Sequence, residues 1–555
     1  MLAIDNEISD QGNLSSHHSM RISQCRWMVL SFLLLCWAEG ATAAEASIQI
    51  KDDNPYHVHA PGEPFSVQVS VTNASGGGVR YYWRNAQGER LSDPAPVNAG
   101  STQTITSPAR EVGYYGLVFE TSTLGLSLPG RRVGEAREYG FVVLPRLSTS
   151  QRRLNPASSF GIVHADPNDP YLGGWVKTTT WLSGRSSRNR NAADAAGWRG
   201  HMDYVRERGL VELPLIADDP WVSDDSKPVP GAQLSLIKNL SKQYFKSDPE
   251  VLFWEVGIEE NITSEYPKAY YWSNLEAKIK AVREAANEAN SGIKLIYQVA
   301  GIDTESVDRF LSSEAAKVYD ILSLHPYAWP DFPSPETWLE DYVNTIRQHM
   351  AENGVANMPI WFTEVGAPHQ GNYPGGFFGY PSDGNQVGGL SRLGEAVYMS
   401  KIYALALPIG INKIFWYNYQ DWGDRREYAE DHFGIRDYWG FPKPAYAAFY
   451  NLRMWLDNKS PGETRQLPGN VWVSEFKGAQ EDVLVVWVYT ENRNKVRSEV
   501  AWSALRPGLS KAGITQIANV VGTPVSAESE GLFVTDEPVF VVVSHAGQQT
   551  IAFPE

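Results

Sequence analysis

Cysteine is nearly absent from this chain, whose 555 residues include only Cys25 and Cys36, both close to the N-terminus. Residues 20–43 contain a basic start, a hydrophobic stretch and a small-residue ending at Ala43, which are the three parts of a secretory signal peptide. Cleavage after Ala43 would remove both cysteines and leave neither a disulfide nor a thiol. Residues 1–19 then form an upstream extension. We therefore expect a secreted or periplasmic protein.

Positive charge is also scarce. The chain has 48 lysine and arginine residues against 64 acidic ones, which gives a net charge of −16. Nucleic acids and anionic membranes bind basic surfaces, so this balance argues against both as partners. Beyond the N-terminal stretch, no apolar run approaches the roughly 18 residues that span a bilayer. We expect no membrane insertion after signal cleavage.

Histidine is infrequent, with 11 residues and no cluster at the spacing of metal ligands, so we expect no cofactor and no metal. Aromatic residues, in contrast, are abundant: the chain has 19 Trp and 27 Tyr. Packing in large cores accounts for most of them. Sugar-binding clefts use them as well, because the C–H faces of sugar rings stack on aromatic rings.

The pattern of predicted strands and helices divides the chain into three parts. The length of the chain also predicts more than one domain. Residues 46–146 carry short alternating strands and suggest an immunoglobulin-like β-sandwich, either a support or a carbohydrate-binding module. After a linker, residues 158–456 alternate buried strands with helices, which predicts a (β/α)₈ TIM barrel. Residues 457–555 return to short strands and predict a C-terminal β-sandwich. The predicted fold class is therefore α/β, a barrel with two flanking sandwiches.

Two strands of the predicted barrel end on a carboxylate. Residues 252–261 and 359–366 each begin as an apolar run and then reach an acidic residue, Glu259 in the first and Glu364 in the second. Active sites of such barrels lie at the C-terminal ends of the strands. Two carboxylates that face one cleft suit the cleavage of a glycosidic bond, where one protonates the leaving oxygen and the other attacks or activates water.

Other polar and aromatic side chains fall at the same strand ends. We expect them to line a substrate-binding cleft with the two carboxylates, because these strand ends converge on one face of a barrel. They are His164, Trp181, Asp218, Trp221, Gln298, His325, Tyr327, Trp416 and Asn418.

These segments resemble the motifs of clan A glycoside hydrolases. Residues 254–261, Trp-Glu-Val-Gly-Ile-Glu-Glu-Asn, are similar to the clan's Trp-Glu-x-x-Asn-Glu-Pro-Asn acid/base motif, and residues 361–366 to its nucleophile motif. Residues 323–327 and 415–418 resemble the ends of its sixth and eighth strands. Within the clan, the chain is most similar to the family 39 group, which holds β-xylosidases, α-iduronidases and exopolysaccharide-degrading hydrolases.

The resemblance implies a secreted retaining glycosidase with Glu259 as general acid/base and Glu364 as nucleophile, their carboxyl groups about 5–5.5 Å apart. It also implies that Tyr327 hydrogen-bonds Glu364 and that Trp416 forms a platform under the sugar. The expected substrate is a polysaccharide or oligosaccharide, for example a bacterial exopolysaccharide.

The chain departs from the clan pattern at three places. Ile258 replaces the asparagine that binds the sugar's 2-hydroxyl, and Glu260 replaces a proline. The clan's arginine near the second strand has no counterpart beyond Lys177 or Arg185. A substrate without a free 2-hydroxyl, another side chain that supplies the contact, or a catalytically inactive polysaccharide-binding barrel would each explain Ile258.

Two further alternatives concern the catalytic groups themselves. Glu260 is the acid if the register of the motif slips by one residue. A metal-dependent hydrolase on the same barrel would use His164, Asp166 and His325, although this set lacks the His-x-His pair of such enzymes.

Overall fold

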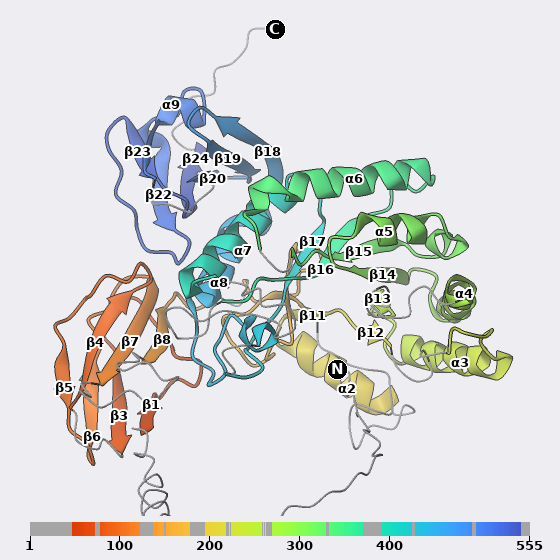
Figure 1. Ribbon diagram of the computed structural model, residues 1–555, viewed down its shortest axis with the longest axis horizontal. Helices are drawn as coiled ribbons and strands as arrows, with labels where there is room; N and C mark the ends of the chain where they lie inside the picture. Colours follow the sequence, from red (N-terminus) through yellow and green to blue (C-terminus); the bar gives the residue numbers. More distant parts are fainter. Residues whose placement is uncertain are drawn as a thin grey trace, which may run out of the picture.

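The computed structural model describes residues 47–72, 78–121, 137–148, 151–177, 195–217, 221, 224–257, 259, 261, 269–328, 332–369, 390–424, 428–490 and 496–545 (Figure 1). Three groups of elements follow one another along the chain. Antiparallel sheets come first, a parallel sheet with helices follows, and antiparallel sheets return at the end.

The N-terminal part forms two sheets that share a hydrophobic core. Along β3, alternate residues Val67, Val69 and Val71 are buried, and they belong to one core with Leu117 and Phe141 of the other sheet. The immunoglobulin likeness and the boundary at residue 146 stay predictions. The first sheet has the order β1 (Ser47–Lys51), β3 (Ser66–Thr72), β6 (Thr102–Thr106), and the second β2 (Val58–His59), β8 (Arg137–Val143), β7 (Gly113–Thr121), β4 (Val79–Asn85), β5 (Ala95–Val97).

The central part is a nine-stranded parallel sheet with the order β11-β10-β9-β17-β16-β15-β14-β13-β12. Its two ends, β11 (Leu210–Glu212) and β12 (Leu215–Ile216), are separated in sequence only by Leu213 and Pro214. They are halves of one broken strand, so the sheet runs around a TIM-like barrel. The other strands are β9 (Phe160–Val163), β10 (Gly174–Lys177), β13 (Phe253–Val256), β14 (Lys294–Ala300), β15 (Ile321–His325), β16 (Ile360–Val365) and β17 (Lys413–Trp416).

The strand that β11 and β12 form is broken at Pro214. Proline lacks the N–H that a central strand donates to its neighbour. The ladder nevertheless continues across the break, because Leu213 N donates to Val176 O at 2.8 Å and Glu255 N donates to Pro214 O at 2.9 Å.

Helices follow the later strands of this sheet. The connection from β9 to β10, residues 164–173, is fully described and contains no helix, so the strict alternation of the (β/α)₈ prediction is incomplete there. The helices are α2 (Ala195–Glu207), α3 (Gly231–Ser247), α4 (Tyr271–Ala289), α5 (Thr304–Leu311), α6 (Leu339–Glu352), α7 (Arg392–Ala406) and α8 (Pro444–Leu456).

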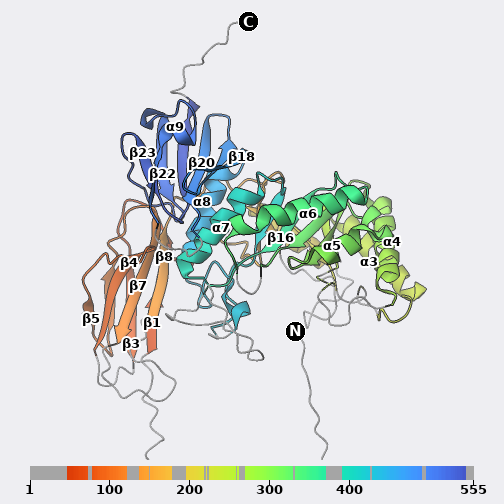
Figure 2. The same cartoon turned by 45° about the horizontal axis from the view of Figure 1, so that its top comes forward.

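The C-terminal part has the strand order β18 (Ser460–Leu467), β19 (Val471–Lys477), β20 (Glu481–Val488), β24 (Val539–Ser544), β22 (Ile514–Asn519), with a second pair of β21 (Ser498–Ala501) and β23 (Gly531–Val534). Both groups of antiparallel sheets lie near α7 and α8, whereas α3 and α4 lie on the far side of the barrel (Figures 1 and 2). The ring of Trp455 in α8 packs 4.5 Å from that of Phe540 in β24.

A layer of large apolar side chains fills the barrel interior on the side nearer the N-terminal ends of the strands. It includes Trp175, Ile296, Ile321, Trp361 and Phe415, one from each of five strands. Because side chains alternate along a strand, the residues two positions later point to the same interior, nearer the C-terminal ends. Four of these are polar: Lys177, Gln298, Ser323 and Thr363. Among the described residues, no helix is both long and apolar enough to cross a membrane.

Candidate active site

Glu364 points into the barrel because β16 is irregular near its end. Thr363 faces the interior, where its hydroxyl contacts His325, while Phe362 lies in the core beneath the helices. Regular alternation would turn the next side chain, Glu364, away from the interior. The pairing register with β17 shifts between Phe362 and Val365, and such bulges re-aim side chains. Glu364 therefore follows Thr363 into the site.

Glu259 reaches the same site through a turn after β13. Gly257 has φ +82° and Glu259 has φ +39°, so both have left-handed backbone conformations. Glutamate seldom adopts such a conformation, and residues that do so are concentrated at functional sites. The turn brings Glu259 Oε1 to 2.5 Å from Nδ1 of His325, the last residue of β15.

The two carboxylates lie close together. One ligand oxygen of each, together with a ring nitrogen of His325, falls within 4.8 Å of the others. His325 Nδ1 is 3.8 Å from Glu364 Oε2, and its Nε2 is 3.0 Å from the Thr363 hydroxyl. The side chains of Glu259 and Glu364 are 24% and 13% exposed, so the cluster is open to solvent and to a ligand.

Each oxygen of Glu364 has a donor. Lys177 Nζ lies 2.8 Å from Oε1, and the Tyr327 hydroxyl donates to Oε2 at 3.1 Å, as the sequence predicted. The same ammonium lies 2.9 Å from Glu255 Oε2 in an ion pair that is fully enclosed. The sequence offered Lys177 or Arg185 as the counterpart of the clan's arginine near the second strand. Lys177 lies beside Glu364, and Arg185 lies outside the described residues.

These contacts set the charge of the site. Burial alone would raise the pKa of Glu364, but the positive charge of Lys177 lowers it to about 2. Burial and Lys177 lower the pKa of His164 to about 4 although Glu364 opposes them, so this ring is neutral at pH 7. Burial and Glu364 raise the pKa of Tyr327 well above its usual range, so its hydroxyl remains a donor.

Several side chains predicted to bind substrate are enclosed in the protein. Trp221, Gln298, Trp416 and Asn418 are 2%, 1%, 0% and 0% exposed. A ring without an exposed face cannot stack on a sugar, so the predicted platform at Trp416 is wrong, and Trp221 packs under the Lys278 ammonium instead. Gln298 and Asn418 are equally out of reach.

The remaining predicted residues divide into two groups. His164 is half-buried beside the carboxylates, and His325 holds Glu259 from a fully buried position. Four residues lie outside the described part of the chain: the predicted contacts Trp181 and Asp218, together with Ile258 and Glu260.

Sequence reasoning missed Trp422, which follows β17 in the loop that leads to α8. Its ring is 55% exposed and lies edge-on to His164 with 5.0 Å between centroids. Its indole N–H donates to the Tyr417 hydroxyl at 2.9 Å. Trp422 is therefore an exposed ring beside His164. Its position in a loop rich in Trp and Tyr was the only signal in the sequence.

The three residues of the metal-hydrolase alternative do not form one ligand group among the described residues. Asp166 Oδ2 accepts a hydrogen bond from Tyr56 at 3.1 Å, whereas His325 contacts Glu259. The group that does converge on His325 consists of Glu259 and Glu364. The ligand set of that alternative is therefore wrong.

Solved structures with a similar fold include glycoside hydrolases. A family 39 glycoside hydrolase from the gut symbiont Bacteroides cellulosilyticus WH2 matches with a TM-score of 0.63 and 17% identity over 90% of this chain and 100% of that chain. A putative β-galactosidase from Bacteroides fragilis matches with a TM-score of 0.36 and 10% identity, covering 80% of this chain and 71% of that chain. The β-glucuronidase 2 of Bacteroides uniformis matches with a TM-score of 0.36 and 11% identity, covering 88% and 57%.

No protein-family model and no curated protein matches the chain. The first structure shares the fold over most of both chains, so the resemblance to the family 39 group is confirmed at the level of the fold.

Proposed function

We propose that this chain is a retaining glycoside hydrolase in which Glu364 is the nucleophile and Glu259 the general acid/base. The observation that carries the proposal is the approach of their carboxylate oxygens to within 4.8 Å. Retaining enzymes hold the two carboxyl groups about 5–5.5 Å apart, whereas inverting enzymes leave about 6.5–9.5 Å for a water molecule. An approach of one oxygen of each carboxylate to within 4.8 Å is compatible with the retaining spacing, and we therefore propose double displacement.

The contacts of Glu364 suit a nucleophile. With a pKa of about 2 it is ionised at any ordinary pH, and Lys177 and Tyr327 fix its two oxygens. In the first step one oxygen attacks the anomeric carbon while Glu259 gives its proton to the leaving oxygen, which forms a glycosyl ester. In the second step Glu259 takes a proton from water, which attacks the same carbon and releases Glu364. His325, 2.5 Å from Glu259, orients the acid.

Exposed aromatic residues support a polymeric substrate. Trp422 stands beside His164, and Gln420, two residues earlier, donates to Tyr438 O at 2.9 Å. Trp439, which follows Tyr438 in the chain, packs against the Arg137 guanidinium of β8. The rings of Trp422, Tyr438 and Trp439 are 55%, 44% and 53% exposed. Exposed aromatic side chains beside His164 and beside β8 suit the binding of a polysaccharide chain, for example a bacterial exopolysaccharide.

Export by the N-terminal signal and a supporting role for the flanking sandwiches complete this proposal. Both rest on the sequence patterns. The alternative of an inactive polysaccharide-binding barrel rests on Ile258. A binder has no use for a nucleophile that an enclosed ammonium keeps ionised, so the Lys177–Glu364 pair favours the enzyme.

The test is a screen of bacterial exopolysaccharides for newly formed reducing ends, with Glu364→Gln as the control. We expect the variant to lose several orders of magnitude of activity, because glutamine cannot act as the nucleophile. Unchanged turnover in Glu364→Gln would remove the assignment. For Glu259→Ala we expect that added azide restores turnover of substrates with good leaving groups, because azide needs no general base.

A further inference from the structure

A second group of metal-ligand side chains meets outside the catalytic site. His369 follows β16, Asp421 follows β17, and His432 ends the short 3₁₀ helix η4 (Ala429–His432). One ligand atom of each lies within 4.8 Å of the others. The three side chains are 2%, 6% and 4% exposed. They lie on separate segments of the sequence, so no local sequence motif predicts the group.

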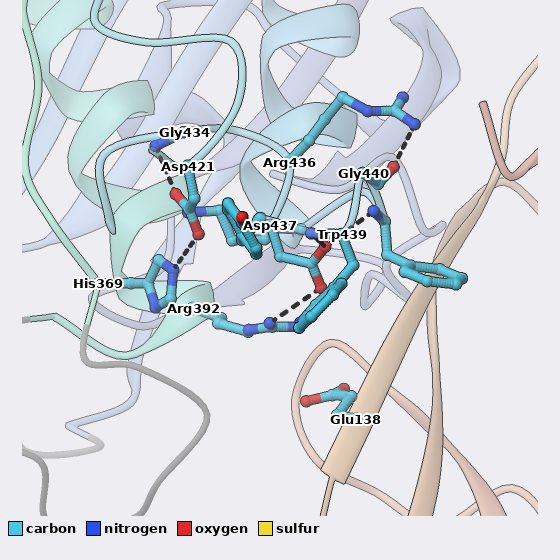
Figure 3. Close-up of polar contacts among 12 residues, drawn as sticks. Glu138, His369, Arg392, Asp421, Gly434, Arg436, Asp437, Trp439 and Gly440 are labelled. Carbon is cyan, nitrogen blue, oxygen red and sulfur yellow. Dashed lines mark hydrogen bonds and ion pairs between the residues drawn. The ribbon is translucent and has the colours of Figure 1, made fainter. Parts of the chain in front are cut away.

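Their geometry fits one shared cation. His369 Nε2 is 3.2 Å from Asp421 Oδ2, and the two face each other in Figure 3. The rings of His369 and His432 have centroids 5.1 Å apart at an interplanar angle of 64°. A tetrahedral metal with bonds of about 2.0–2.1 Å places neighbouring ligand atoms about 3.4 Å apart and two imidazole centroids about 5 Å apart. Both observed distances are close to these values.

The surroundings fix Asp421 so that one of its oxygens faces His369. Its Oδ1 accepts from Gly434 N at 2.7 Å and from Lys443 Nζ at 3.1 Å, which leaves Oδ2 directed at His369. Contacts of this kind commonly fix the carboxylates that bind metals. The position of Gly434 N beside this oxygen is visible in Figure 3.

Lys443 also joins this site to a second buried carboxylate. Its ammonium lies 3.1 Å from Asp421 and 3.1 Å from Glu395, and all three side chains are buried. Lys443 therefore holds Asp421 in place.

We propose that His369, Asp421 and His432 bind a divalent transition-metal cation of the zinc type. Two imidazole nitrogens and one carboxylate oxygen favour zinc over calcium or magnesium, which prefer sets made only of oxygen. The three ligands stand on the segments that follow two adjacent strands, and His369 N already donates to His432 O at 3.2 Å. The metal would therefore fasten the loop that carries Trp422 to the end of β16.

This site takes no part in bond cleavage, so it stands or falls independently of the proposed function. The simpler alternative is that the His369–Asp421 hydrogen bond and the Lys443 ion pairs suffice without a metal. The experiment must also exclude binding at Glu259, His325 and Glu364, the other described group whose ligand atoms converge.

The test is elemental analysis of the purified full chain, followed by chelation and titration with Zn²⁺ alone. We expect about one equivalent of zinc per chain, a melting temperature several degrees lower after chelation, and its recovery when Zn²⁺ is restored. His432→Gln and Asp421→Asn should each reduce bound zinc at least tenfold. Glu259→Gln, in the catalytic group, and His349→Gln, on α6, should keep the full equivalent.

Two results would overturn the site. One is wild-type protein that neither retains zinc nor gains thermal stability when Zn²⁺ is titrated into the chelated chain, a result that does not depend on any variant folding. The other is loss of zinc in Glu259→Gln with retention in His432→Gln, which would move the metal to the catalytic carboxylates.

Discussion

The ammonium of Lys177 lies 2.8 Å from Oε1 of Glu364, although the two residues come from different barrel strands, β10 and β16. The same ammonium also holds Glu255, which is fully buried. One cation thus serves two carboxylates inside the barrel, and it opposes the effect of burial on the pKa of Glu364.

Replacing Lys177 with methionine should change the acid side of the pH profile. In the native protein Glu364, with a pKa of about 2, is ionised across the whole working range. Without the ammonium, burial dominates and the pKa of Glu364 rises. We expect kcat/KM of Lys177→Met to fall about 10²-fold or more at neutral pH, and its acid limb to move to higher pH.

Lys177→Arg is the matched control, because it keeps the positive charge and restores much of the native profile. Melting temperatures separate this effect from unfolding, since removing one partner of a buried ion pair costs about 3–5 kcal/mol. An acid limb that stays in place in Lys177→Met would contradict the role of the ammonium.

The hydroxyl of Tyr327 should matter for activity and little for stability. Tyr327→Phe removes only the hydrogen bond to Glu364 Oε2, so one oxygen of the nucleophile loses its donor. A hydrogen bond to a charged group contributes about 1.5–3 kcal/mol, so we expect kcat/KM to fall about 10- to 100-fold. Tyr342→Phe is the control, because it removes a buried hydroxyl that bonds Gly301 O away from the site. Equal activities of the two variants would refute the prediction.

Trp422→Ala should weaken the binding of polymer without disturbing the chemistry. Its ring is largely exposed, so the fold loses little. Loss of one stacked sugar at about 1–1.5 kcal/mol predicts a KM about 5- to 12-fold higher for the polysaccharide. The kcat for a small aryl glycoside should change less. Leu236→Ala, an exposed apolar residue on α3, is the control.

Stability should depend on pH through Glu364. Its pKa in the folded chain lies below the ordinary glutamate value of 4.5. The ionised carboxylate therefore favours folding above about pH 4.5, and this contribution disappears as the pH falls toward about 2. Thermal unfolding from pH 6 to pH 3 should cost the wild type more stability than Glu364→Gln. Parallel curves for the two proteins would exclude this coupling.

The sequence predicted the barrel and the two strand ends that lead to Glu259 and Glu364, because buried parallel strands are continuous apolar runs, as in 359–363. It could not predict the break at Pro214, where the backbone ladder crosses a residue without an N–H. It also missed β18, Ser460–Leu467, an edge strand with a Pro-Gly pair and no apolar alternation.

Within the site, the sequence identified the residue types better than their exposure. Trp416 and Trp422 lie six positions apart in one aromatic segment, and only the path of the chain after β17 buries the first and exposes the second. The inward turn of Glu364 depends on a bulge in β16, which pattern alone does not reveal. The contact of Lys177 with Glu364 depends on two strands meeting across the barrel.

The most direct test of the account is peptide mapping after incubation with a panel of 2-deoxy-2-fluoroglycosides, which trap the glycosyl-enzyme of retaining glycosidases. If Glu364 is the nucleophile, the peptide that contains it gains the mass of one glycosyl group, and the same peptide of Glu364→Gln gains none. No label on Glu364 with any sugar of the panel, or a label on Glu259 instead, would contradict it.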